Sequence, residues 1–169
     1  MKNFTLFVFV AVFGLATFSC KSDDNAVYMD YDTYPVVYDV KNANFSLVDG
    51  VYQIARTFNN PMYETDMLLA YMQVGSTNNN SPIWQQIPIT FYLDDGNEVD
   101  YNYDFSRYDF VIYAGGTFNL GGSSYISNKT FRILLVPASY GKSSNVDYSD
   151  YDSVVNFYGI DDSRPRILK

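Results

Sequence analysis

Few residues of this 169-residue chain can carry out chemistry. The sequence has no histidine and one cysteine, Cys20. Catalytic triads, Cys-His dyads and histidine- or cysteine-ligated zinc all require imidazoles or several thiolates, so these sites are excluded. The pairs Gly115-Gly116 and Gly121-Gly122 lack the spacing and the Lys-Ser/Thr ending of a phosphate-binding loop. Asp, Glu, Tyr and Lys remain as acids and bases.

Paired carboxylates are the first chemistry left open. Glycoside hydrolysis uses two of them, and the chain has two glutamates, Glu64 and Glu98, neither within a recognisable motif. We therefore expect a protein that is not an enzyme and that has a binding or structural role. A carboxylate-based hydrolase is the least favoured alternative.

Metal binding by the acidic segment 94–98 is the second chemistry left open. Its side chains Asp94, Asp95, Asn97 and Glu98 offer the hard oxygen atoms that calcium prefers. Their spacing differs from that of an EF-hand loop, and a hairpin turn explains the same residues. We expect no metal and no cofactor, and this loop is the place where a weak calcium site would lie.

Ligand binding by aromatic side chains is the third chemistry left open. The chain has 17 Tyr and 13 Phe, which is more than a small core needs. Exposed rings stack on sugars or form protein-binding patches, whereas buried rings line a core. Both interpretations are open for Tyr101, Tyr103 and Trp84, which are the candidate ligand-stacking residues. The corresponding partner is an unidentified protein or glycan.

The net charge of −8 argues against nucleic acid as a partner. A negative chain repels phosphate backbones, and no basic stripe interleaved with aromatic residues is present.

The N-terminal segment predicts export. Lys2 precedes an apolar run over residues 4–18, which is typical of a signal peptide over residues 1–19. The run is shorter than the roughly 20 residues of a membrane span. An exported chain with one cysteine has no internal disulfide, so Cys20 needs another role.

The position of Cys20 after Ser19 resembles the lipobox of bacterial lipoproteins. The resemblance implies that Cys20 is lipidated, becomes the mature N-terminus and anchors the chain to the membrane. The Phe-Ser-Cys form looks like the lipoboxes of Bacteroidota, which implies the outer membrane. Residues 21–24, Lys-Ser-Asp-Asp, are similar to the acidic signal for the cell surface in that group, and equally fit an ordinary polar tether. Residues 20–34 are thus the lipidated N-terminus and tether.

The elements that position these residues are mainly strands. Short alternating or apolar segments joined by Gly, Asn and Asp turns predict an antiparallel β-sandwich of about eight strands, with a closed barrel as the alternative. The expected strands cover residues 36–40, 45–48, 51–58, 67–74, 83–87, 89–93, 98–105, 108–114 and 131–136. The domain is expected to span residues 35–160, followed by a flexible tail over 161–169.

One short C-terminal helix is also expected. Ser149 and Asp152 resemble a capping box, and Gly159 is placed to end the helix. An apolar stripe follows helical spacing at Tyr151, Val154, Val155 and Tyr158. Asp152-Ser153-Val154 looks like an acceptor triplet for O-glycosylation at Ser153 in Bacteroidota, although such triplets also arise by chance.

From Trp84 onward the chain resembles a family of small, functionally uncharacterised surface lipoproteins from flavobacteria. The resemblance covers about half of the chain and implies a shared β-rich fold and a lipid anchor, without a known activity. It is carried by Trp84-Gln85-Gln86-Ile87-Pro88, Thr90-Phe91-Tyr92, Tyr101-Asn102-Tyr103-Asp104-Phe105, Thr117-Phe118-Asn119-Leu120, residues 131–138, Asp147-Tyr148 and residues 151–160.

Overall fold

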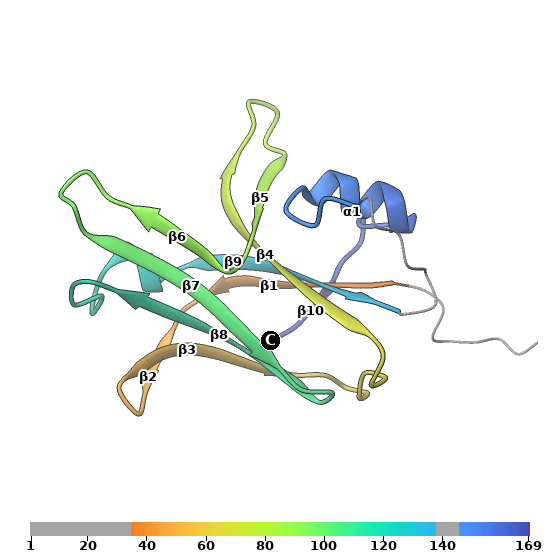
Figure 1. The fold of residues 1–169 in the computed structure, drawn as a ribbon, viewed down its shortest axis with the longest axis horizontal. Helices are drawn as coiled ribbons and strands as arrows, with labels where there is room; N and C mark the ends of the chain where they lie inside the picture. The colour runs from red at the N-terminus through yellow and green to blue at the C-terminus, as the bar shows by residue number, and fades with distance from the viewer. Residues whose placement is uncertain (1–34, 138–145) are drawn as a thin grey trace, which may run out of the picture.

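The computed structural model describes residues 35–137 and 146–169. They form two five-stranded sheets that pack as a β-sandwich, with one short C-terminal helix (Figure 1). This architecture confirms the predicted β-sandwich. The alternative, a closed barrel, is wrong. The signal peptide, Cys20 and the tether lie outside the described residues.

The two sheets contain all ten described strands, and every pairing is antiparallel except that between β1 and β10. The first sheet has the order β10 (Arg166–Ile167), β1 (Val36–Ala43), β9 (Lys129–Val136), β4 (Met67–Ser76) and β5 (Pro82–Gln86). The second has the order β2 (Ser46–Val48), β3 (Val51–Thr57), β8 (Asp109–Gly116), β7 (Glu98–Phe105) and β6 (Ile89–Tyr92).

Strand β4 is buried on both faces, as its continuous apolar run predicts. Leu68, Ala70 and Met72 face the main core between the sheets. Leu69 and Tyr71 face the opposite way, into a second apolar cluster that the C-terminal helix covers. Alternate side chains of one strand thus hold together the sandwich and the helix.

Helix α1 (Tyr151–Tyr158) buries its predicted apolar stripe against this outer face of the first sheet. Its N-cap is Asp150, whose side chain accepts a hydrogen bond from the amide of Asp152. The expected cap, Ser149, instead donates its hydroxyl to Asp147. Gly159 ends the helix in the left-handed conformation with φ 60°, as predicted. The helix is too short to cross a membrane, and no other described helix could.

The C-terminal segment differs from the expected loose tail. Arg166 and Ile167 form β10, which pairs in parallel with β1. The amide of Leu168 donates to the carbonyl of Asp39 at 3.0 Å, and the Leu168 side chain is buried in the main core. Pairing with the free edge of β1 and burial of one leucine fix a segment too short to show periodicity.

Candidate functional site

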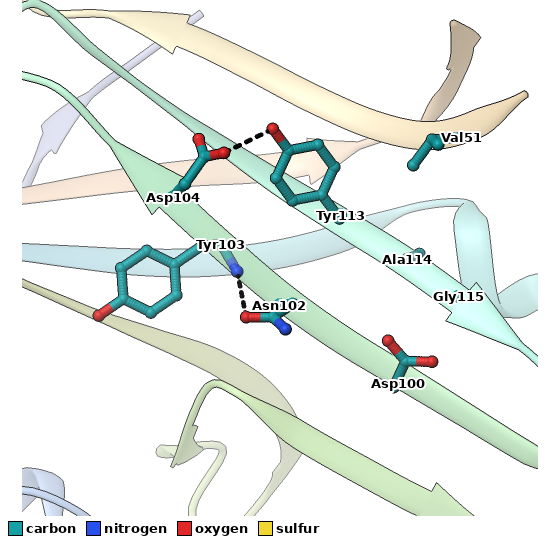
Figure 2. A pocket seen from close by; sticks show the side chains of 8 residues that line it. All are labelled: Val51, Asp100, Asn102, Tyr103, Asp104, Tyr113, Ala114 and Gly115. Carbon is teal, nitrogen blue, oxygen red and sulfur yellow. Dashed lines mark hydrogen bonds between the residues drawn. The ribbon is translucent and has the colours of Figure 1, made fainter. Parts of the chain in front are cut away.

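The outward face of the second sheet carries a shallow pocket of about 410 Å³ (Figure 2). Its residues come from neighbouring strands β3, β7 and β8. They are Val51, Asp100, Asn102, Tyr103, Asp104, Tyr113, Ala114 and Gly115.

Alternation along β7 positions the polar residues of this pocket. Val99 and Tyr101 face the core, so Asp100, Asn102 and Asp104 face outward, as the sequence predicts. These three residues form a polar row along one strand of the sheet.

The register across β7 and β8 completes the pocket. Asn102 lies opposite Tyr113, and Asp100 lies opposite Gly115. The Tyr113 hydroxyl donates to Asp104 Oδ2 at 2.8 Å, which raises the pKa of that hydroxyl above its ordinary value (Figure 2). The ring of Tyr113 is thereby held beside the carboxylate.

Gly115 leaves the space that the Asp100 carboxylate occupies. A Cβ atom at position 115 would lie 2.6 Å from Asp100 Oδ1, inside any normal contact. The glycine therefore lets this carboxylate lie across β8, and a larger residue would force it to turn away.

The chemistry of the pocket is that of hydrogen bonding. Asn102 Oδ1 accepts from the amide of Tyr103 at 2.9 Å, so its amide nitrogen is the group that can donate to a ligand. Asp100 and Asp104 supply acceptors, and Tyr113 supplies a ring face. The described lining residues include no Lys, Arg, Ser or Cys. These groups can hold a ligand by hydrogen bonds and by contact with a ring.

Two of the predicted stacking residues turn inward. Tyr101 is fully buried, its ring packs against Phe45 and Phe131, and its hydroxyl donates to the Tyr125 carbonyl at 2.6 Å. Tyr103 is half-buried, and its hydroxyl donates to the Leu68 carbonyl at 3.2 Å. The stacking role is therefore wrong for Tyr101, because its ring is core.

Trp84 lies on the outer face of the first sheet and is half-buried. The Arg132 guanidinium carbon lies 4.6 Å from the centre of its ring, and the Tyr151 ring lies 5.9 Å away. The indole therefore packs against Arg132 and Tyr151, and it lies on the other sheet from Tyr101 and Tyr103.

A buried ionic cluster around Arg132 is the feature that sequence reasoning missed. Arg132 Nε donates to Asp39 Oδ1 at 2.7 Å, and Nη2 donates to Oδ2 at 3.1 Å. Nη1 donates to the Tyr151 hydroxyl at 2.8 Å and to Asp162 Oδ2 at 2.9 Å. Burial alone would lower the pKa of Arg132, but the bonds to Asp39 and Tyr151 outweigh it and raise the pKa.

The Arg132 cluster joins β1, β9, α1 and the C-terminal segment. A shallow pocket of about 280 Å³ lies beside it. Because Arg132 already bonds to Asp39, Tyr151 and Asp162, we assign the cluster to structure. The sequence does contain a signal for this cluster. Asp39 and Arg132 are each the charged residue of an otherwise apolar strand segment, residues 36–40 and 131–136.

Two residues of the acidic turn proposed for calcium, Asp95 and Asn97, use their side-chain oxygen atoms for hydrogen bonds within the protein. Asp95 Oδ1 accepts from the Asn97 amide at 3.0 Å, and Asp95 Oδ2 accepts from the Asn97 side chain at 2.9 Å. These bonds lower the pKa of Asp95. Asn97 Oδ1 accepts from the Thr117 hydroxyl at 3.0 Å. Within residues 35–137 and 146–169, no three His, Cys, Asp or Glu side chains gather as metal ligands.

The two glutamates of the hydrolase alternative are not paired. Glu64 lies between β3 and β4 and forms an ion pair with Arg107 at 3.1 Å, whereas Glu98 begins β7. Ser153, the predicted glycosylation site, is half-buried on α1 and donates to Asp150 Oδ2 at 2.5 Å. Its hydroxyl thus has a structural role at the start of the helix.

Comparison of the chain with protein-family models, curated proteins and solved structures finds no significant match.

Proposed function

We propose that this chain is a lipid-anchored protein of the bacterial outer membrane, exposed at the cell surface, that acts by binding and not by catalysis. The observation that carries the proposal is the apolar run over residues 4–18, followed after Ser19 by the only cysteine of the sequence, Cys20. The resemblance of residues from Trp84 onward to flavobacterial surface lipoproteins supports the same cellular location.

The test of the anchor is Cys20→Ser. Only a thiol forms the thioether bond to the lipid, so cells fed radiolabelled palmitate should label the wild-type chain and leave the variant unlabelled. Label in the variant at the wild-type level would rule out lipidation at Cys20. The matched control is Ser19→Ala, which keeps a small residue before the cysteine and should retain the label.

A binding role is supported by the side chains available for chemistry. The pocket on β7 and β8 presents carboxylates, an amide and a ring, which are groups that hold a ligand by hydrogen bonds. The carboxylate-based hydrolase is disfavoured because Glu64 is engaged by Arg107 and lies apart from Glu98.

Capture of a polysaccharide is the second candidate. The specific observation is that Asn102 lies opposite Tyr113 and that Asp100 lines the same pocket. Sugars are held by paired polar groups and by stacking on rings. With two carboxylates and no basic residue among the described lining residues, this pocket would favour neutral glycans over acidic ones.

A pull-down with insoluble neutral polysaccharides, followed by a glycan array, tests this candidate. Gly115→Ala should weaken retention, because the new Cβ turns Asp100 away. Gly75→Ala is the matched control, since its Cβ would make only an ordinary contact with Ile83 at 3.7 Å. Retention that is unchanged in Gly115→Ala and Asn102→Ala would exclude this pocket as the glycan site.

A further inference from the structure

The described chain begins at Pro35, directly before β1. Val36 pairs with Leu135, and Met67, the first residue of β4, pairs with the adjacent Val136. Strands β1 and β4 therefore begin at the same end of the sandwich, which we call the tether end. Figure 1 shows these strand starts on the right of the molecule.

Two loops meet at the tether end: residues 58–66 between β3 and β4, and residues 106–108 between β7 and β8. The Met62 amide donates to the Arg107 carbonyl at 2.7 Å, and Arg107 Nε donates to the Met62 carbonyl at 2.8 Å. A pocket of about 250 Å³ lies between the loops. The reciprocal bonds make the two loops one surface.

Three large aromatic side chains are exposed on this surface. Tyr63 is 51% exposed, Phe105 is 46% exposed and Tyr108 is 62% exposed. Tyr63 and Phe105 line this pocket, and Tyr108 follows Arg107 in the second loop. We therefore treat the three rings as one patch. Amphipathic rings such as tyrosine are enriched at the headgroup level of membranes.

The charges around the patch restrict what it can contact. Arg107 is neutralised by its ion pair with Glu64 at 3.1 Å. Asp66 and Asp109 add carboxylates next to the two loops. The excess of carboxylates around the patch would repel anionic lipid headgroups. It would not repel headgroups that have no net charge.

We propose that the tether end docks on the uncharged headgroup region of the bilayer that holds the lipid on Cys20, with Tyr63, Phe105 and Tyr108 entering the interface. The inference rests on the proposed lipidation. Residues 21–34 separate the anchor from Pro35, and a segment of that length spans at most about 50 Å when fully extended. The anchor thus gives the patch a high effective concentration at the membrane, so a contact too weak to bind free vesicles suffices.

The test uses the lipidated full chain in phosphatidylcholine vesicles with one added cysteine, which carries an environment-sensitive fluorophore. Asn60→Cys places the label at the tether end, and Asn79→Cys places it in the turn between β4 and β5, at the other end of β4. Both asparagines are exposed loop residues, so the two variants are matched. Doxyl-labelled lipid should quench the label at position 60 and leave the label at position 79 unquenched.

Tyr63→Ser combined with Tyr108→Ser should remove the quenching at position 60 while the lipid remains attached. Equal quenching at both positions, or full quenching at position 60 in the double serine variant, overturns the docking proposal. Circular dichroism checks that each variant retains the β fold.

The mass of the Cys20 peptide and flotation of the chain with vesicles measure the anchor separately. A chain that carries no lipid and does not float overturns the anchor and the docking together. A chain that carries lipid and floats, but whose label at position 60 is not quenched, overturns the docking alone.

Discussion

Replacing Asp39 by asparagine tests the role assigned to the buried ionic cluster. Asp39 is 1% exposed and Arg132 is 7% exposed, and the two make a bidentate pair with bonds of 2.7 and 3.1 Å. The asparagine would keep the size of the side chain but leave a buried guanidinium without its principal counter-ion. Removal of one partner from a buried pair costs about 3–5 kcal/mol.

The lower end of that range applies here, because Arg132 keeps its bonds to Tyr151 and Asp162. We therefore expect Asp39→Asn to lower the free energy of unfolding by about 3 kcal/mol. At about 2–4 °C per kcal/mol, the melting temperature should fall by roughly 6–12 °C. Urea unfolding of the unlipidated mature chain measures this. Trp84, the only tryptophan in the sequence, lies against Arg132 and reports on the cluster by fluorescence.

Asp162→Asn is the matched control, because the Asp162 side chain is 34% exposed to water. Its loss should cost no more than about 1 kcal/mol, as for other ion pairs that solvent screens. Asp39→Leu combined with Arg132→Met should recover much of the stability, because apolar side chains often replace a buried pair without cost. Equal small losses in Asp39→Asn and Asp162→Asn would refute the reasoning, as would a double variant as unstable as Asp39→Asn.

Three further predictions follow from particular residues. Burial raises the pKa of Tyr71, Tyr101 and Tyr151, so the folded state keeps their protons. These tyrosines should leave the urea midpoint unaffected below about pH 10 and lower it as the pH rises further. A midpoint at about pH 12 that equals the midpoint at about pH 9 would contradict this. Because the Asp95 and Asn97 side chains of the 94–98 turn bond to one another, the melting temperature in EDTA should lie within about 3 °C of that in excess calcium. A drop of about ten degrees would reveal a cation site. Leu168→Ala should lower the free energy of unfolding by about 2 kcal/mol, because the side chain is buried in the main core. Ile167→Ala, at the exposed neighbouring residue, should change it by no more than about 0.5 kcal/mol. Urea unfolding separates the two, and equal effects would place the C-terminal segment outside the core.

The sandwich was predictable because its signals are local. The alternation over residues 98–105 shows which side chains of β7 face outward, and the continuous run in β4 shows that both of its faces are buried. The helix was predictable from its stripe and from Gly159. The same alternation also places Tyr101 on the side of Val99, so its burial could have been read from the sequence.

The candidate site could be predicted only in part, because it depends on register. Asp100 and Asn102 are outward in the sequence pattern, but nothing in the pattern pairs Asp100 with Gly115 or Asn102 with Tyr113. The pairing of Asp39 with Arg132 across β1 and β9 is likewise a long-range fact. Strand β10 has two residues, which is too short for any periodicity.

The most direct measurement of the central claim is the mass of the N-terminal peptide of the protein extracted from bacterial membranes. A lipid-anchored surface protein should yield a peptide that starts at Cys20 and carries a diacylglycerol on its sulfur. A peptide that starts elsewhere, or an unmodified Cys20 thiol in a chain that fractionates away from the membrane, would contradict the account.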